Sequence, residues 1–126
     1  MDYFLLKTEP DSYSFDDLVK ERETDWTGVA NPQAVKNLAA MKKGDGLVIY
    51  HTGKEKRAVG MARVVSVDLS DPKQPLVRIS AGSAIARPKT LAEIKQEPIF
   101  KDSPLLRQGR LSVAPLTKAQ YDWISQ

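Results

Sequence analysis

The chain has 126 residues, of which 41% are hydrophobic and 28% charged, and its formal net charge is +3. This balance is typical of a single folded domain over residues 1–126, and it excludes an intrinsically disordered chain. Because there is no cysteine and only one histidine, His51, we expect no disulfide framework, no metal site and no cofactor.

The first predicted elements are a strand and a short helix. Residues Tyr3–Lys7 are apolar and aromatic, and Pro10 ends the strand because proline cannot donate to a ladder. Ser14 has the position of an N-cap, with acidic residues in the turn that follows. We therefore predict a helix from Ser14 to about Glu21.

A second helix is predicted from Pro32 to about Met41, directly after the loop DWTGVANPQA (residues 25–34). Further strands are expected at Leu47–His51, at Ala58–Leu69 with a bulge at Gly60, at Leu76–Ser80 and at Leu111–Val113. Capping boxes predict helices at Thr90–Gln96 and Thr117–Ser125. Strands dispersed among short helices indicate an α+β fold and argue against a Rossmann-type sheet.

The loop before the second helix has the composition of a binding site. Trp26 offers a flat face for stacking, Gly28 lets the backbone approach a ligand closely, and Asn31 and Gln33 carry amides that donate and accept. The alternative is structural, with the indole covering the core, Asn31 as N-cap and Pro32 as the first helical residue.

Five ordered motifs make the chain resemble the EVE domain family of the PUA-like superfamily, which also holds the YTH and ASCH domains. The motifs are KTEP (residues 7–10), WTGVANPQA (26–34), YHT (50–52), PKTLAEIK (88–95) and RLSVAP (110–115). One departure is Ala30, where the family usually has Arg, so a contact from that Arg is not carried over. The resemblance implies a small mixed β-barrel with helices packed around it.

The resemblance also implies a function, which is to bind a modified nucleobase, above all a modified cytosine in DNA or RNA, without catalysis. By matching positions, Trp26 would be the stacking wall and Asn31 would contact the base edge. The remaining ligand-binding candidates are His51 and Thr52 on the facing strand, Gly28 and Val29 at the floor, Gln33 in the loop, and Lys7, Thr8 and Glu9 at the rim. The expected partner is a nucleic acid or nucleotide that carries such a base.

Two other functions stay open at this point. ASCH domains include amidohydrolases that act on acetylated cytidine through Lys, Thr and Glu, and Lys7, Thr8 and Glu9 supply these types. Because neighbours on a strand point to opposite faces, the three would converge only if the chain kinks at Thr8. The other alternative is a general RNA-binding surface. A Ser/His/Asp triad built on His51 lacks the G-x-S-x-G elbow.

Individual candidates also have structural alternatives. Glu9 could receive backbone donors at a turn, and Lys7 could pair with Glu9 along one strand face. His51 at a strand end could be a buried imidazole whose hydrogen bonds are satisfied by the protein. Tyr50, Tyr121 and Trp123 are expected to pack in the core or against the terminal helix.

Charge is distributed unevenly along the chain. Residues 1–31 hold eight Asp or Glu against three Lys or Arg, whereas residues 32–126 hold eight against sixteen. Basic side chains could follow a phosphate backbone, although a solvated face is the alternative. The candidates are Lys42, Lys43, Lys54, Lys56, Arg57, Arg107 and Arg110. With no apolar stretch of membrane-spanning length, we expect a cytoplasmic monomer or weak dimer without membrane contact.

Overall fold

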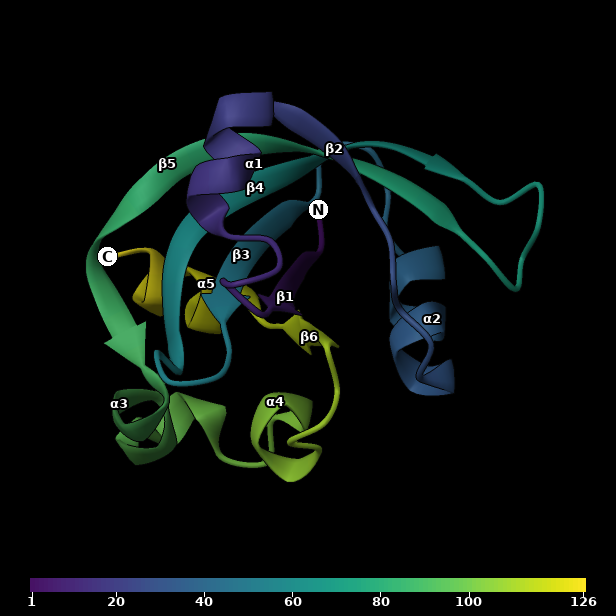
Figure 1. Cartoon of the computed structure of the whole chain (residues 1–126). Helices are drawn as coiled ribbons and strands as arrows, with labels where there is room; N and C mark the ends of the chain where they lie inside the picture. The colour runs from purple at the N-terminus through teal and green to yellow at the C-terminus, as the bar shows by residue number, and fades with distance from the viewer.

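The computed structural model describes residues 1–126, which form one curved six-stranded sheet surrounded by short helices (Figure 1). The strands are Tyr3–Thr8 (β1), Glu23–Trp26 (β2), Gly46–His51 (β3), Arg57–Asp68 (β4), Leu76–Thr90 (β5) and Val113–Leu116 (β6). The helices are Phe15–Glu21 (α1), Pro32–Ala39 (α2), Leu91–Gln96 (α3), Pro104–Arg107 (α4) and Lys118–Ser125 (α5), with a 3-10 turn at Pro98–Phe100 (η1). The predicted α+β class is confirmed. None of the helices has the length and apolar composition that a membrane crossing requires.

The strand order is β2-β5-β4-β3-β1-β6. Strands β1 and β3 are parallel, and every other neighbouring pair is antiparallel. All six residues of β3 are buried, as expected for a strand covered on both faces. The parallel pairing sets Thr8 opposite His51, so the KTEP and YHT motifs at the ends of these strands lie side by side.

Local sequence signals explain the helix boundaries. Ser14, Thr90 and Thr117 are N-caps of α1, α3 and α5, and each takes part in a complete capping box. Asn31 caps α2, and Pro32 follows as its first residue. The predicted helix starts are therefore confirmed, while α2 ends at Ala39, two residues earlier than expected.

The irregularity predicted at Gly60 is also present. The register between β4 and β5 shifts on both sides of Gly60, and a Cβ at this position would overlap the ring of Phe15. Glycine thus lets α1 pack directly on the backbone of β4, which lies in the middle of the sheet.

Three strand predictions need correction. The polar segment that forms β2 was not predicted at all, because a short edge strand with exposed alternate residues gives little apolar pattern. Strand β5 continues to Thr90 instead of ending at Ser80. The strand expected at Leu111–Val113 is present but shifted, since β6 begins at Val113 and includes Pro115, which an edge strand tolerates.

Candidate functional site

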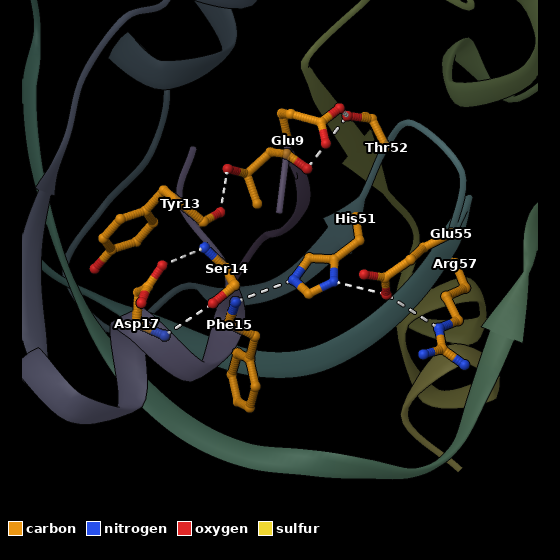
Figure 2. Close-up of polar contacts among 10 residues, drawn as sticks. Glu9, Tyr13, Ser14, Phe15, Asp17, His51, Thr52, Glu55 and Arg57 are labelled. Carbon is orange, nitrogen blue, oxygen red and sulfur yellow. Dashed lines mark hydrogen bonds and ion pairs between the residues drawn. The ribbon is translucent and has the colours of Figure 1, made fainter. Parts of the chain in front are cut away.

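The carboxyl ends of β1 and β3 form a fixed corner. The backbone amide of Thr52 donates to the carbonyl of Thr8 over 2.9 Å, and the Thr52 hydroxyl lies 3.3 Å from a carboxylate oxygen of Glu9 (Figure 2). The hydroxyl of Thr8 donates to the carbonyl of Tyr13 over 2.7 Å. Gly53 has φ of 72°, and a Cβ there would lie 2.7 Å from the Glu9 carboxylate. The positive φ favours glycine here, and the missing Cβ leaves room for the Glu9 carboxylate.

Trp26, the last residue of β2, lies beside this corner and borders a small cavity. The residue is only 8% exposed, yet it lines a cavity of about 190 Å³ together with its neighbour Asp25. The other lining residues are Thr8, Tyr13, Thr24 and Thr27. We call this the Trp26 cavity. It combines two aromatic rings with three hydroxyl side chains.

The ring of Tyr13 stands edge-on to the indole of Trp26, with 6.2 Å between centroids and 78° between planes. Its hydroxyl is buried and has no partner in hydrogen-bonding geometry. Burial, and then the neighbouring Glu21 carboxylate, raise the pKa of Tyr13 to about 12. Tyr13 is therefore uncharged at neutral pH and holds the indole in place through an aromatic contact.

A larger groove lies beyond Trp26, between the loop that follows β2 and helix α2. It has a volume of about 420 Å³ and is lined by residues 26–30, by Val35 and Leu38 of α2, by residues 73–75 of the β4–β5 connection and by Leu76 of β5. We call it the α2 groove. The predicted floor residues Gly28 and Val29 lie here, together with Ala30, and not in the Trp26 cavity.

Asn31 and Gln33 use their amides within α2. The Oδ1 atom of Asn31 accepts from the backbone amides of Gln33 and Ala34 at 2.9 and 3.1 Å. The side-chain amide of Gln33 donates to Asn37 over 3.2 Å. The helix-cap interpretation of Asn31 is thus confirmed. Neither amide lines the Trp26 cavity or the α2 groove, so their contact with a ligand stays a prediction.

His51 is 7% exposed, and both of its ring nitrogens have protein partners (Figure 2). The backbone amide of Phe15 donates to Nε2 over 3.0 Å, so the ring proton lies on Nδ1 and is donated to Glu55, also over 3.0 Å. This hydrogen bond is the main cause that lowers the pKa of Glu55, whose carboxylate also accepts from Arg57. His51 therefore ties the start of α1 to β3, and its predicted ligand contact stays a prediction.

The other face of β1 borders a third cavity, of about 250 Å³, which we call the Lys7 cavity. Its lining includes Lys7, Tyr50, Thr52, Lys56, Lys95 and Leu105. The ammonium of Lys7 donates to the carbonyl of Gly109 over 3.0 Å and lies 5.9 Å from the centre of the Tyr50 ring. Burial lowers the pKa of Lys7. Lys7 bonds to this carbonyl and not to Glu9, the pairing considered from the sequence.

The EVE domain profile matches residues 2–126. The chain belongs to the EVE domain family. Thymocyte nuclear protein 1 from Gallus gallus is 29% identical over 97% of this chain and 66% of its own length. The protein of the same name from Homo sapiens is 28% identical, with 97% and 72% covered. The chain thus spans about two thirds of the length of these curated relatives.

Solved structures give the same assignment for this EVE domain. Protein Atu2648 from Agrobacterium tumefaciens has a TM-score of 0.91 at 32% identity, with 99% of this chain and 91% of that chain covered. Human THYN1 in complex with DNA containing 5-methylcytosine has a TM-score of 0.86 at 27% identity, with 99% and 96% covered. An ASCH protein from Zymomonas mobilis, 12% identical with a TM-score of 0.59 over 98% and 96%, shares the fold alone. The expected PUA-like fold is confirmed.

The three residues required by the amidohydrolase alternative do not converge in this EVE domain. Lys7 bonds to Gly109, Thr8 to the carbonyl of Tyr13, and Glu9 accepts from Thr52. Lys7 and Thr8 line different cavities on opposite faces of β1. No kink brings the three together, so no observation in this structure favours that reaction.

The predicted phosphate contacts divide by position. Arg57 and Arg107 are engaged in ion pairs with Glu55 and Asp102. The five others have no carboxylate partner; these are Lys42, Lys43, Lys54, Lys56 and Arg110. Lys42 and Lys43 precede β3, whereas Lys54 and Lys56 follow it, about 20 Å away along the strand. Only the second pair lies at the corner formed by the ends of β1 and β3.

Sequence reasoning missed several residues that line these cavities, among them Tyr13, Thr24, Thr27 and Lys95. Thr24 could have been found if β2 had been recognised, because residues two apart on a strand share a face and Thr24 would then lie beside Trp26. Tyr13 and Lys95 carry no such local signal, since the fold brings them to the site from a turn and from α3.

Proposed function

We propose that this EVE domain is a non-enzymatic module that binds a modified cytosine in DNA or RNA, and that the base enters the Trp26 cavity. The observation that carries the proposal is the cavity itself, because it places an indole next to several hydroxyl groups at the corner built by the family motifs. The relative solved with DNA containing 5-methylcytosine supports this choice of base.

The size of the cavity suits one ring. A dry protein cavity of roughly 150 Å³ accommodates benzene, and the Trp26 cavity has about 190 Å³. One pyrimidine fits this volume, whereas a base pair does not. The base must therefore leave the helical stack before it enters, as in other proteins that recognise single bases.

The lining supplies both stacking and polar contacts. Stacking of a base on one aromatic side chain contributes about 1–3 kcal/mol, which gives little selectivity. The hydroxyls of Thr24 and Thr27 can each donate and accept, whereas the Thr8 hydroxyl donates to Tyr13 and is left as an acceptor. This set suits a cytosine edge that has an amino donor beside acceptors. The rings of Trp26 and Tyr13 offer apolar surface to a methyl group, and one methyl is worth about 1–3 kcal/mol in a fitted pocket.

The proposal is tested by fluorescence anisotropy with labelled single strands that differ only in one central base, 5-methylcytosine or cytosine. We expect the methylated strand to bind at least about tenfold more tightly. Matched duplex and RNA strands then identify the preferred carrier. Equal affinity for the two bases in every carrier would contradict the proposal.

Two conservative variants assign the preference to the cavity. Trp26→Phe keeps an aromatic ring but reduces the stacking surface, so we expect the preference for 5-methylcytosine to fall. Trp123→Phe changes the other tryptophan, which lines none of the cavities described above, and should bind like the unchanged protein. Thermal unfolding of both variants shows whether each is folded at the temperature of the titration.

A further inference from the structure

The Lys7 cavity has the charge of an anion site. Three lysines, Lys7, Lys56 and Lys95, contribute to its wall, and no Asp or Glu does. The side chains of Lys56 and Lys95 are exposed and form no ion pair. Clustered lysines that are not neutralised by carboxylates attract phosphate groups.

Lys7 has hydrogen-bonding capacity to spare. Its ammonium carries three N–H donors, and one of them is used by the carbonyl of Gly109 at 3.0 Å. The group is half-buried, and burial lowers its pKa. An anion in the cavity would accept hydrogen bonds from the remaining N–H groups of Lys7 and favour its charged form.

The backbone holds Lys56 at this cavity in an uncommon conformation. Its φ is 46°, in the left-handed region that lysine rarely adopts. The backbone amide of Leu91, at the start of α3, donates to the Lys56 carbonyl over 2.8 Å. This bond fixes the β3–β4 turn against α3, the helix that also carries Lys95.

Apolar and aromatic side chains also form part of the wall. These are Tyr50, which is buried, and Leu91, Leu105 and Leu106. Thr52, Gly53 and Gly109 complete it. A bare inorganic ion would leave this surface uncovered. The matching occupant combines an anionic group with an apolar, planar group, which is the chemistry of a nucleotide.

The Trp26 cavity and the Lys7 cavity lie on opposite faces of one strand, β1. Lys7 and Thr8 are consecutive residues of β1, whose side chains point to opposite faces, and each lines one cavity. We infer that the Lys7 cavity binds a second nucleotide, which is adjacent to the modified base in the same nucleic-acid strand. Both the phosphate and the nucleoside of this second nucleotide would contact the cavity. The inference rests on the function proposed above, and it makes the recognised unit a dinucleotide step.

The test uses the double variant Lys56→Gln/Lys95→Gln, which removes two exposed charges but leaves Lys7 and its bond to Gly109 unchanged. We expect binding of the strand with 5-methylcytosine to weaken about fivefold to tenfold at low salt, with a shallower salt dependence. The preference for 5-methylcytosine over cytosine should persist. The matched control is Lys42→Gln/Lys43→Gln at the opposite end of β3, which should bind like the unchanged protein.

A second measurement assigns the effect to the neighbouring phosphates. Replacing the phosphodiesters that flank 5-methylcytosine by uncharged methylphosphonates should weaken binding to the unchanged protein more than to the double variant. Equal losses in both proteins, or equal effects of the two lysine pairs, would overturn the inference. If the base preference is absent but the lysines and flanking phosphates remain coupled, the proposed function fails and the phosphate site stands.

The same ligand chemistry could come from a free nucleotide. This source is distinguished by a titration with deoxycytidine monophosphate in which the NMR chemical shifts of the backbone amides of residues 53–56 are monitored. Shifts at micromolar nucleotide, with no coupling to the flanking phosphates of an oligonucleotide, would assign the cavity to a free nucleotide and overturn the dinucleotide step. No shift with the mononucleotide, combined with that coupling, supports the step.

Discussion

The chain has two tryptophans, and their surroundings differ in an informative way. Each stands edge-on to an aromatic partner, Trp26 to Tyr13 at 6.2 Å and Trp123 to Phe100 at 5.5 Å. Trp26 is the more buried of the two, yet it borders both the Trp26 cavity and the α2 groove. Trp123 is partly exposed on α5 and borders none of the cavities described.

The contacts of Trp123 indicate a structural role. The ammonium of Lys89 lies 5.7 Å from the Trp123 ring centre and donates to the carbonyls of Arg87 and Ile124. This arrangement fastens α5 to β5, the strand that carries Lys89. Solvent exposure alone therefore does not identify a ligand-binding ring. A concave neighbourhood with free polar groups is the better criterion.

The largest expected difference between the two regions is in stability. Replacing Trp26 by Ala should lower the free energy of unfolding by about 3–5 kcal/mol, because a nearly buried indole is lost from the core. Trp123→Ala should have a smaller effect, since part of its ring already contacts solvent. Urea unfolding of both variants measures the difference. A larger loss for Trp123→Ala would contradict the burial argument.

Replacing His51 tests whether this residue stabilises the Trp26 region without contacting the ligand. Its Nε2 accepts from Phe15, two residues after Tyr13, so it helps to hold the ring that contacts Trp26. His51→Ala leaves that buried amide without a partner and should cost about 1–3 kcal/mol. The preference for 5-methylcytosine over cytosine should persist in the folded fraction. A lost preference with unchanged stability would instead indicate the direct ligand contact expected from the sequence.

The difference between the two tryptophans was only partly predictable from the sequence. The packing of Trp123 in the terminal helix followed from the capping box at Thr117, which is a local signal. The loop at Trp26 was also found locally, through Gly28 and Pro32. Its strand was missed, because β2 forms only by pairing with β5, more than fifty residues away.

The site was predicted as one pocket, and the structure distributes its residues over several surfaces. Lys7 and Thr8 are adjacent in the sequence but line different cavities. This geometry follows from the alternation of side chains along a strand, and it separates residues that the motif places together. The hydrogen bonds that occupy His51 come from α1 and from the turn after β3. Such partners are set by the fold, and no local pattern identifies them.

Lys89 provides the matching test on the Trp123 side. Lys89→Met keeps the length of the apolar stem but removes the hydrogen bonds to Arg87 and Ile124, so we expect a loss of about 1–2 kcal/mol. Base preference should be unaffected, because Lys89 lies apart from both cavities. Unfolding and anisotropy measured on the same sample separate the two effects. A changed preference would mean that the two regions are coupled through the sheet.

The smallest expected effect distinguishes the helix caps of the two regions by their pH dependence. In α1 the capping box uses Asp17, whose pKa is lowered by hydrogen bonds from the backbone amide and hydroxyl of Ser14. In α5 the same position is Gln120, which does not titrate. Only the cap near Trp26 should therefore weaken in acid.

The sign follows from the lowered pKa of Asp17. The carboxylate contributes stability above its ordinary pKa of 3.8, and that contribution is lost as the pH falls through the lower pKa of the folded state. Asp17→Asn should thus be less stable than the unchanged protein at neutral pH, with the gap closing in acid. The control Asp16→Asn removes a charge from the same turn but no hydrogen bond of the capping box. The test is to measure urea unfolding midpoints of these proteins across the acid pH range. A stability difference between Asp17→Asn and the unchanged protein that is constant with pH would show that the Asp17 carboxylate does not stabilise this cap.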